Sequence, residues 1–308
     1  MGATHAASYS RDGRARVVAT TDVNGTSAQA LAESCGAQAY ADVETMLAES
    51  KLNAISICTP PACHCQQAVT ALQAGVHVLC EKPFAPTVEE AQRMVDASRS
   101  SGALLMPAFC HRFHPPVAAL KRLITSGKLG RVTMFRNRFS GEFRGVEKTW
   151  FVKREISGGG VLVDTCSHSV DLFRFLVGEV SVAAALTSRH LEGLDTEDTG
   201  AILLKSQDGA IGTIEASWLT PVGAAVIEVY GTEGKAVLDY STDTLSYRIR
   251  GDTDWTTETP ESDTDRFTAE VQHFLDAVLG KSKLALTSED GLRSVEILTR
   301  AYAVEKTL

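Results

Sequence analysis

Residues 54–83 read AISICTPPACHCQQAVTALQAGVHVLCEKP, and this stretch decides the fold class. A short apolar run, 54–60, precedes a helix-length segment, 62–74, which stops at Gly75, and a second apolar run, 76–80, follows. Strands that alternate with helices at this spacing form a parallel sheet, because parallel neighbours need a crossover and a helix is the usual one. The stretch therefore predicts one unit of an α/β fold.

The same alternation extends over the first part of the chain. The further elements expected there are strands at 15–22 and 103–109 and helices at 27–35, 42–50 and 87–100. We therefore predict a Rossmann-like, dinucleotide-binding domain with a parallel sheet at residues 1–115.

Beyond residue 116 the pattern changes. The expected elements are a helix to about 126, a strand at 132–139, a glycine break at 158–160 before a helix to about 177, at least five strands between 180 and 250, and helices at 265–279 and 288–306. Hairpin-length turns join the strands, which indicates antiparallel pairing. Residues 116–308 are thus expected to form an α+β domain with a mostly antiparallel open sheet.

Composition excludes several classes of protein. The 308 residues are 44% hydrophobic and 22% charged, which is typical of a globular chain, and the net charge of -8 comes without a basic block that could bind nucleic acid or lipid. No apolar stretch is long enough to span a bilayer. Seven cysteines, an odd number, lie partly inside apolar runs and indicate a reducing cytoplasm. We expect no nucleic-acid or membrane partner.

The N-terminus departs from the usual dinucleotide-binding pattern. That pattern is a strand, a Gly-x-Gly-x-x-Gly turn and, about 20 residues on, an acidic residue that binds the adenine ribose. Asp22 ends the first apolar run, and its distance from Gly2 fits the third glycine. The first strand and first two glycines would then lie upstream of Met1, leaving two strands without a ladder partner. Asp22 would repel a 2′-phosphate, so NAD is favoured over NADP.

Polar residues follow the predicted strands, at the edge where ligands bind in open parallel sheets. They are Thr59, Pro60 and His64 after the first run, Glu81 and Lys82 after the second, and His111 and Arg112 after the last. Lys82 directly follows a buried run, where an ammonium group can polarise a substrate oxygen. A solvated lysine at a strand end is the alternative reading.

The second half offers an acid and an imidazole at helical spacing. Asp164 and His168 are four residues apart, so a helix would place them on one face, and the preceding glycines would allow a close backbone approach. An imidazole is well suited to move a hydroxyl proton near neutral pH. An ordinary surface pair is the alternative. We expect no metal site, because Cys63, His64 and Cys65 lack a second cysteine pair at zinc-ligand spacing.

Together these residues resemble the glucose-fructose oxidoreductase, inositol dehydrogenase and rhizopine-catabolism (Gfo/Idh/MocA) oxidoreductases. The resemblance is carried by Met1 to His5, Cys58 to Pro61 with His64, Glu81 to Pro83, Arg112 to Pro115, and Gly159 and Gly160 with Asp164, His168 and Asp171. It implies hydride transfer between NAD(H) and a sugar, cyclitol or related polyol carbon. It also implies a homodimer or homotetramer formed through the sheet of the second domain.

The resemblance further implies a role for each matching residue. Lys82, Asp164 and His168 would be catalytic, with Asp164 positioning the substrate and His168 acting as general acid or base. Gly2, Asp22, Thr59, Pro60, His64, Glu81 and Lys82 would bind the cofactor, and Arg112 and Trp150 would line the substrate pocket with Asp164 and His168. Two alternatives stay open: a relative that cleaves glycosides by transient oxidation and elimination, and a catalytically silent scaffold.

Overall fold

The computed structural model describes residues 1–305, which form two compact units. The first comprises Met1–Cys110 and Thr264–Leu292, and the second comprises His111–Asp263 and the described residues from Arg293 onward. The border near residue 110 lies close to the one expected at 115. The segment 264–292 was expected in the second domain, but it returns to the first unit.

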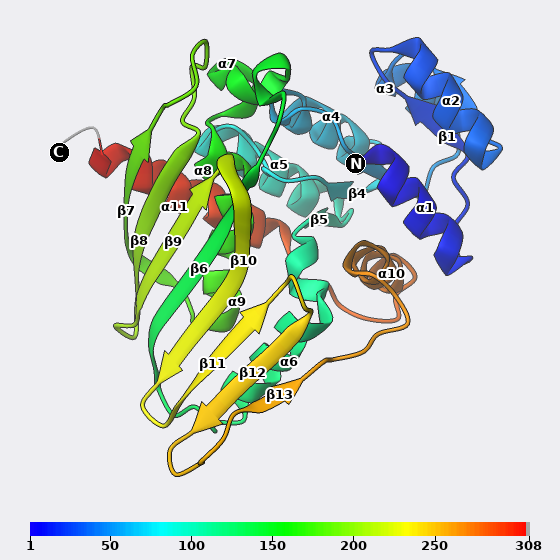
Figure 1. The fold of residues 1–308 in the computed structure, drawn as a ribbon. Coiled ribbons are helices and arrows are strands. Elements are labelled where there is room, and N and C mark those ends of the chain that lie inside the picture. The colour runs from blue at the N-terminus through cyan, green and yellow to red at the C-terminus, as the bar shows by residue number, and fades with distance from the viewer. Residues whose placement is uncertain (306–308) are drawn as a thin grey trace. The chain divides into compact units, whose positions relative to one another are not determined.

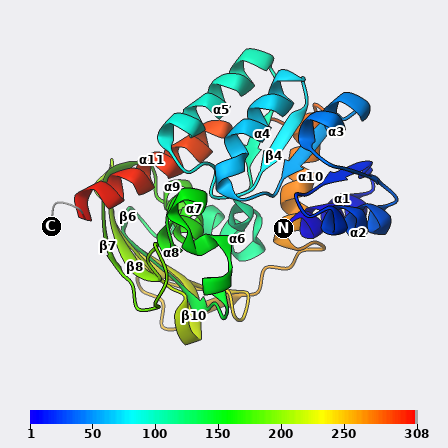
Figure 2. The same cartoon turned by 90° about the horizontal axis from the view of Figure 1, so that it is seen from above.

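The first unit is an α/β unit. Its strands are β1 (Ala19–Thr21), β2 (Gln38–Tyr40), β3 (Ala54–Ile57), β4 (His77–Cys80) and β5 (Leu105–Pro107), and its helices are α1 (Gly2–Asp12), α2 (Gly25–Cys35), α3 (Val43–Glu49), α4 (Pro61–Gln73), α5 (Val88–Ser101) and α10 (Arg266–Val278). All strand pairs in it are parallel. Helices α4 and α5 lie side by side near β4 (Figure 2). Gly102 ends α5 in the left-handed region at φ 70°, which glycine adopts without strain.

The sheet of the first unit is divided into two pieces. One piece pairs β1 with β2, and the other has the order β3-β4-β5. Among the described residues, no ladder joins β1 to β3. Within the part of the chain that the structure describes, β1 pairs only with β2 and β3 only with β4, so the two strand edges expected to lack a ladder partner do lack one.

Helix α10 belongs to the first unit because it packs along α1. Arg11 on α1 forms an ion pair with Asp265 at the N-cap of α10, and Arg14, beyond the end of α1, forms one with Asp276 on α10. The buried side chains of α10, including Val271 and Phe274, supply apolar contact surface. Contacts of this kind, between segments more than 250 residues apart, carry no local signature in the sequence.

The second unit is built on a large open sheet. Its strands are β6 (Val132–Glu142), β7 (Val180–Ser188), β8 (Thr199–Ser206), β9 (Ile211–Ser217), β10 (Leu219–Gly231), β11 (Gly234–Asp239), β12 (Thr244–Ile249) and β13 (Thr256–Glu258). They lie in the order β13-β12-β11-β10-β6-β9-β8-β7 (Figure 1). Every pair is antiparallel except β6 with β9, so the expected mostly antiparallel sheet is confirmed.

Helices cover one face of this sheet. They are α6 (Pro115–Thr125), α8 (Val161–Asp164) and α9 (Cys166–Leu176). The same part of the chain also forms the short helix α7 (Arg154–Ser157) and the 3₁₀ turns Cys110–Phe113, Val146–Lys148 and Trp150–Val152. Helix α11 (Ser288–Glu305) begins in the first unit and ends in the second. Figure 2 shows α8 and α9 against the sheet. Phe173 on α9 meets Phe135 on β6 edge to face, 5.4 Å between centroids, in the core. No helix among residues 1–305 is both long and apolar enough to cross a membrane.

Candidate functional site

Lys82 lies in a turn that directly follows β4. The strand is fully buried at Val78, Leu79 and Cys80, and the chain then turns at a cis peptide between Lys82 and Pro83. Lys82 itself is half-buried. The apolar run therefore places the lysine at the carboxyl end of a central buried strand, as its position in the sequence predicted.

Glu81 is a buried carboxylate, and each of its two oxygens has a hydrogen-bond partner. Oε1 lies 3.0 Å from Nε2 of His5, and Oε2 accepts a hydrogen bond of 3.0 Å from the backbone N–H of Lys82. Burial alone would raise the pKa of Glu81, but the hydrogen bond and charge of His5, with the charge of Lys82, outweigh burial and lower the pKa. Glu81 is therefore held as a carboxylate.

His5 is the partner of Glu81 and is equally buried. Burial alone would lower the pKa of His5, but hydrogen bonds to Cys58 and Glu81 outweigh it and raise the pKa to about 10. Its Nδ1 lies 3.1 Å from Oγ of Ser56, and the hydroxyl of Tyr9 lies 2.9 Å from the same oxygen. In the sequence, His5 had no role beyond the family resemblance, and Ser56 and Tyr9 were not predicted as its partners. The one local signal is that His5 and Tyr9 are four residues apart on α1, which places them on one face of that helix.

His64 is fully enclosed on α4. Its Nε2 lies 2.7 Å from the carbonyl oxygen of Thr59, and its Nδ1 lies 3.0 Å from that of Pro83. Burial lowers the pKa of His64 and favours the neutral ring, which donates a hydrogen bond to one of the two carbonyls. The imidazole thus lies between the two turns that follow β3 and β4.

The remaining expected cofactor residues lie at the ends of elements. Gly2 begins α1, and a Cβ atom there would meet only Leu31, at 3.8 Å. Asp22 follows β1 and is exposed, and its Oδ1 accepts the N–H of Asn24 at 2.8 Å. Pro60 is the N-cap residue of α4, and the hydroxyl of the preceding Thr59 donates to Gln67 at 2.7 Å. Helix N-termini and an exposed carboxylate are groups that suit the pyrophosphate and ribose of a dinucleotide.

In the second unit the glycine break lies directly against the backbone of another segment. A Cβ atom on Gly160 would lie 1.9 Å from the carbonyl oxygen of Glu197. The Glu197 carboxylate, itself buried, accepts the N–H groups of Gly160 and Leu162 at 2.9 and 3.2 Å, which caps the start of α8. The expected close backbone approach is present, and it fixes where α8 begins.

Asp164 ends α8, and His168 lies in the first turn of α9. Thr165 between them keeps right-handed helical dihedral angles, so the two residues stay one helical turn apart. Asp164 is half-buried, and His168 is 9% exposed. The expected spacing is therefore present, although the helix is divided into α8 and α9.

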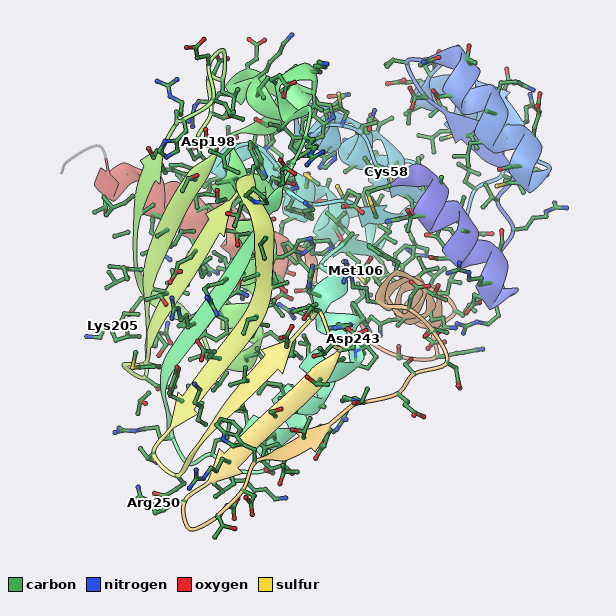
Figure 3. All side chains as sticks on the ribbon, in the orientation of Figure 1. Cys58, Met106, Asp198, Lys205, Asp243 and Arg250 are labelled. Atoms are coloured by element: carbon green, nitrogen blue, oxygen red, sulfur yellow. The ribbon has the colours of Figure 1, made fainter. Side chains whose placement is uncertain are left out.

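His168 has an aromatic neighbourhood that the sequence did not predict. Its ring centroid lies 4.4 Å from that of His111, whose Nδ1 lies 2.9 Å from the hydroxyl of Tyr240. The ring of His114 stacks on Tyr240, 4.6 Å between centroids, and its Nε2 lies 3.2 Å from Asp243. Figure 3 labels Asp243, which lies in the β11–β12 turn. These contacts orient His111 beside His168.

Arg112 and Trp150, both expected in the substrate pocket, make intramolecular contacts. Arg112 donates through Nε and Nη2 to the two oxygens of Asp171 at 2.8 and 2.5 Å, and its guanidinium lies 5.1 Å from the ring centroid of Phe175. Trp150 stacks on Phe151 at 3.9 Å. Arg112 therefore fixes the start of the second unit to α9.

Comparison with known proteins identifies the family. Residues 1–109 match the model described as an oxidoreductase family, NAD-binding Rossmann fold, and residues 117–237 match the GFO/IDH/MocA C-terminal domain. The chain belongs to the Gfo/Idh/MocA oxidoreductase family. The resemblance expected from the motifs is confirmed, and so is the NAD-binding Rossmann domain followed by an α+β domain.

Several curated relatives are sugar dehydrogenases by name. The chain is 30% identical to a D-xylose 1-dehydrogenase (NADP(+)) of Haloferax volcanii, over 91% of this chain and 86% of that protein. It is 30% identical to a levoglucosan dehydrogenase of Pseudarthrobacter phenanthrenivorans over 65% of this chain, and 35% identical to a D-glucoside 3-dehydrogenase of Escherichia coli over 56%. These last two alignments span 58% and 50% of the relatives' own lengths.

Solved structures agree on the fold. A levoglucosan dehydrogenase in complex with NADH and levoglucosan superposes with a TM-score of 0.92 over 100% of this chain and 95% of that chain, at 24% identity. GenD2 from gentamicin A biosynthesis, in complex with NAD, gives 0.88 over 99% and 91% at 27% identity.

Proposed function

We propose that the protein is an NAD-dependent dehydrogenase that transfers a hydride between NAD(H) and a hydroxyl-bearing carbon of a sugar, cyclitol or related polyol. The observation that carries the proposal is the placement of Lys82: it follows a buried strand of the NAD-binding half, in a turn held by a buried ion pair. Lys82, Asp164 and His168 supply an ammonium, a carboxylate and an imidazole, which are the groups this reaction needs.

The residues of the first unit fit a dinucleotide. Asp22 would accept hydrogen bonds from the adenine ribose, and its charge favours NAD over NADP. The N-terminus of α1 at Gly2 would face the pyrophosphate, and Thr59, Pro60, His64 and Glu81 would form the wall nearer the nicotinamide. When bound, the nicotinamide ring would supply the hydride acceptor, or the donor in the reverse direction.

Each catalytic residue has one task in this proposal. His168 takes the proton of the reacting hydroxyl, or returns it to the carbonyl in reduction. The Lys82 ammonium donates a hydrogen bond to the same oxygen and stabilises the negative charge that develops on it. Asp164 accepts a hydrogen bond from a neighbouring hydroxyl of the sugar, and Arg112 and Trp150 contribute to its surroundings.

We further propose a homodimer or homotetramer through the open face of the large sheet. The strand register places exposed apolar side chains on that face: Met134, Val182, Leu186, Leu203 and Ile211. Apolar surface of this kind is usual at subunit interfaces.

A cytoplasmic location fits the seven cysteines, which all remain free thiols in the part of the chain the structure describes.

The proposal is tested by mixing the protein with NAD and a panel of pentoses, hexoses, anhydrosugars and inositols, and recording NADH absorbance. At least one compound should yield NADH in proportion to oxidised product. Cleavage of a glycoside without net NADH would instead indicate the oxidation and elimination reaction. Failure to bind NAD in calorimetry would contradict the proposal.

A further inference from the structure

The turn that carries Lys82 is tied to helix α1 by a single buried carboxylate. Glu81 uses one oxygen for His5 and the other for the backbone N–H of Lys82. His5 and Glu81 are 76 residues apart in the chain and only 1% and 6% exposed. The link is therefore a long-range contact from which water is largely excluded.

We propose that His5 is a positioning residue for Lys82: it holds the Glu81 carboxylate, which fixes the backbone of the turn from which the lysine side chain projects. The proposal rests on the catalytic role proposed for Lys82. His5 does not touch the substrate in this account and acts only through Glu81.

The hydrogen-bond pattern around His5 supports this role. A doubly protonated ring donates from Nε2 to Glu81 and from Nδ1 to Ser56, whose hydroxyl also meets Tyr9. Both ring nitrogens are thereby used, and the ring is fixed in orientation. A charge-assisted hydrogen bond is short and directional, which suits it to hold a neighbouring carboxylate in one rotamer.

The same contact links Lys82 to the cofactor side of the unit. His5 lies one helical turn from Gly2, where α1 begins and where the pyrophosphate is proposed to bind. A displacement of α1 would be passed to Glu81 and then to the backbone of Lys82. We infer that cofactor binding at α1 and placement of the lysine are coupled through His5.

Two conservative substitutions separate the contacts of His5. In His5→Gln the side-chain amide can take the place of Nε2 and still donate to Glu81. In His5→Asn the shorter amide can take the place of Nδ1 and reach Ser56 but not Glu81. Tyr9→Phe is the matched control, because it removes a half-buried hydroxyl that contacts Ser56 and leaves both contacts of His5, to Glu81 and to Ser56, in place.

The primary measurement is the reactivity of the Lys82 amine, which needs no substrate. Folded protein is acetylated briefly with acetic anhydride, and each lysine is quantified by peptide mass spectrometry, with the exposed Lys51 as internal reference. We expect His5→Asn to change the rate at Lys82 severalfold, with His5→Gln and Tyr9→Phe close to wild type. Equal rates at Lys82 in all four proteins would overturn the proposal, even if His5→Asn lowers the unfolding midpoint.

Turnover provides the second measurement. For a compound that the wild type oxidises, His5→Asn should lower kcat by about 100-fold, the effect of a small misplacement of a catalytic group, with KM for the sugar little changed. His5→Gln should restore most of the rate. Lys82→Ala separates the two proposals: normal turnover in it would contradict the role of Lys82, whereas its loss together with normal turnover in His5→Asn would contradict only the role of His5.

Discussion

Nε2 of His5 lies 3.0 Å from Oε1 of Glu81, and both side chains are buried in the first unit. Against the effect of burial, hydrogen bonds to Cys58 and Glu81 raise the pKa of His5, and the hydrogen bond and charge of His5 lower the pKa of Glu81. The contact is thus an ion pair at the pH where the protein would work. It joins the helix at the start of the chain to the turn that carries the proposed catalytic lysine.

This ion pair predicts a defined dependence of stability on pH. Protonated His5 contributes stability that is complete below its unfolded pKa of 6.5 and is lost as pH rises through about 10. Ionised Glu81 contributes stability that is present above its unfolded pKa of 4.5 and is lost as pH falls through its lower folded pKa. Urea unfolding between pH 4 and 11 should therefore show greatest stability between the two unfolded pKa values, at roughly pH 5 to 6, with a steady loss as pH rises from about 6.5 to about 10.

Removing one partner of the pair tests the same contact. Glu81→Gln should lower the free energy of unfolding at neutral pH by about 3–5 kcal/mol, because it leaves His5 buried without its counter-charge. Glu233→Gln, which breaks an exposed pair with Arg250, should cost less than about 1 kcal/mol. Similar losses in the two variants would contradict a buried, charged pair.

The glycine before α8 makes a second prediction about stability. Gly160→Ala places a methyl group against the carbonyl oxygen of Glu197, so the backbone must shift, and the free energy of unfolding should fall by about 1–3 kcal/mol or more. Gly141→Ala is the control, because nothing lies within 4 Å of its Cβ position. Chemical denaturation of both variants measures the difference. A loss no larger at position 160 than at 141 would refute the close approach.

The ion pair between Arg112 and Asp171 predicts that Arg112, a residue expected in the substrate pocket, also stabilises the fold. Asp171→Asn should destabilise the protein by about 3–5 kcal/mol, since it leaves a largely buried guanidinium without its bidentate partner. Glu179→Gln, at the half-exposed partner of Arg174, should cost less than about 1 kcal/mol. If Asp171→Asn alters only KM for the sugar and leaves thermal unfolding unchanged, the ion pair is not structural.

The open sheet face predicts self-association. Leu203, which is 57% exposed on β8, lies at the centre of the apolar side chains on that face. Leu203→Lys should lower the mass found by sedimentation equilibrium to that of a smaller oligomer or a monomer, whereas Val222→Lys, at an irregular part of β10, should not. A monomeric wild type would contradict the interface.

Local patterns were sufficient to predict most elements of the fold. The helix expected at 62–74 spans Pro61–Gln73, and the one expected at 87–100 spans Val88–Ser101. Strand β2 was missed because its three residues, Gln38 to Tyr40, form no apolar run. The return of α10 to the first unit was missed because it depends on packing against α1, which leaves no periodic signal.

The candidate site was predictable only in part. Lys82 and the spacing of Asp164 and His168 could be read from strand ends and helical periodicity. The partners that orient such groups could not, because His5 and Glu81 are 76 residues apart and His111 and Tyr240 are 129 apart. Which polar groups meet at such distances is decided by tertiary packing, and no single-sequence pattern records it.

The hydride-transfer rates of Lys82→Ala and His168→Ala test the central proposal most directly. They would be followed as single-turnover NADH formation from a sugar or cyclitol that the wild type oxidises, with NAD binding measured in parallel by calorimetry. We predict that each substitution slows the transfer by about 10² to 10⁴-fold and that His168→Ala leaves NAD affinity within a few-fold of wild type. Transfer at close to the wild-type rate in either variant would contradict the assignment of that residue.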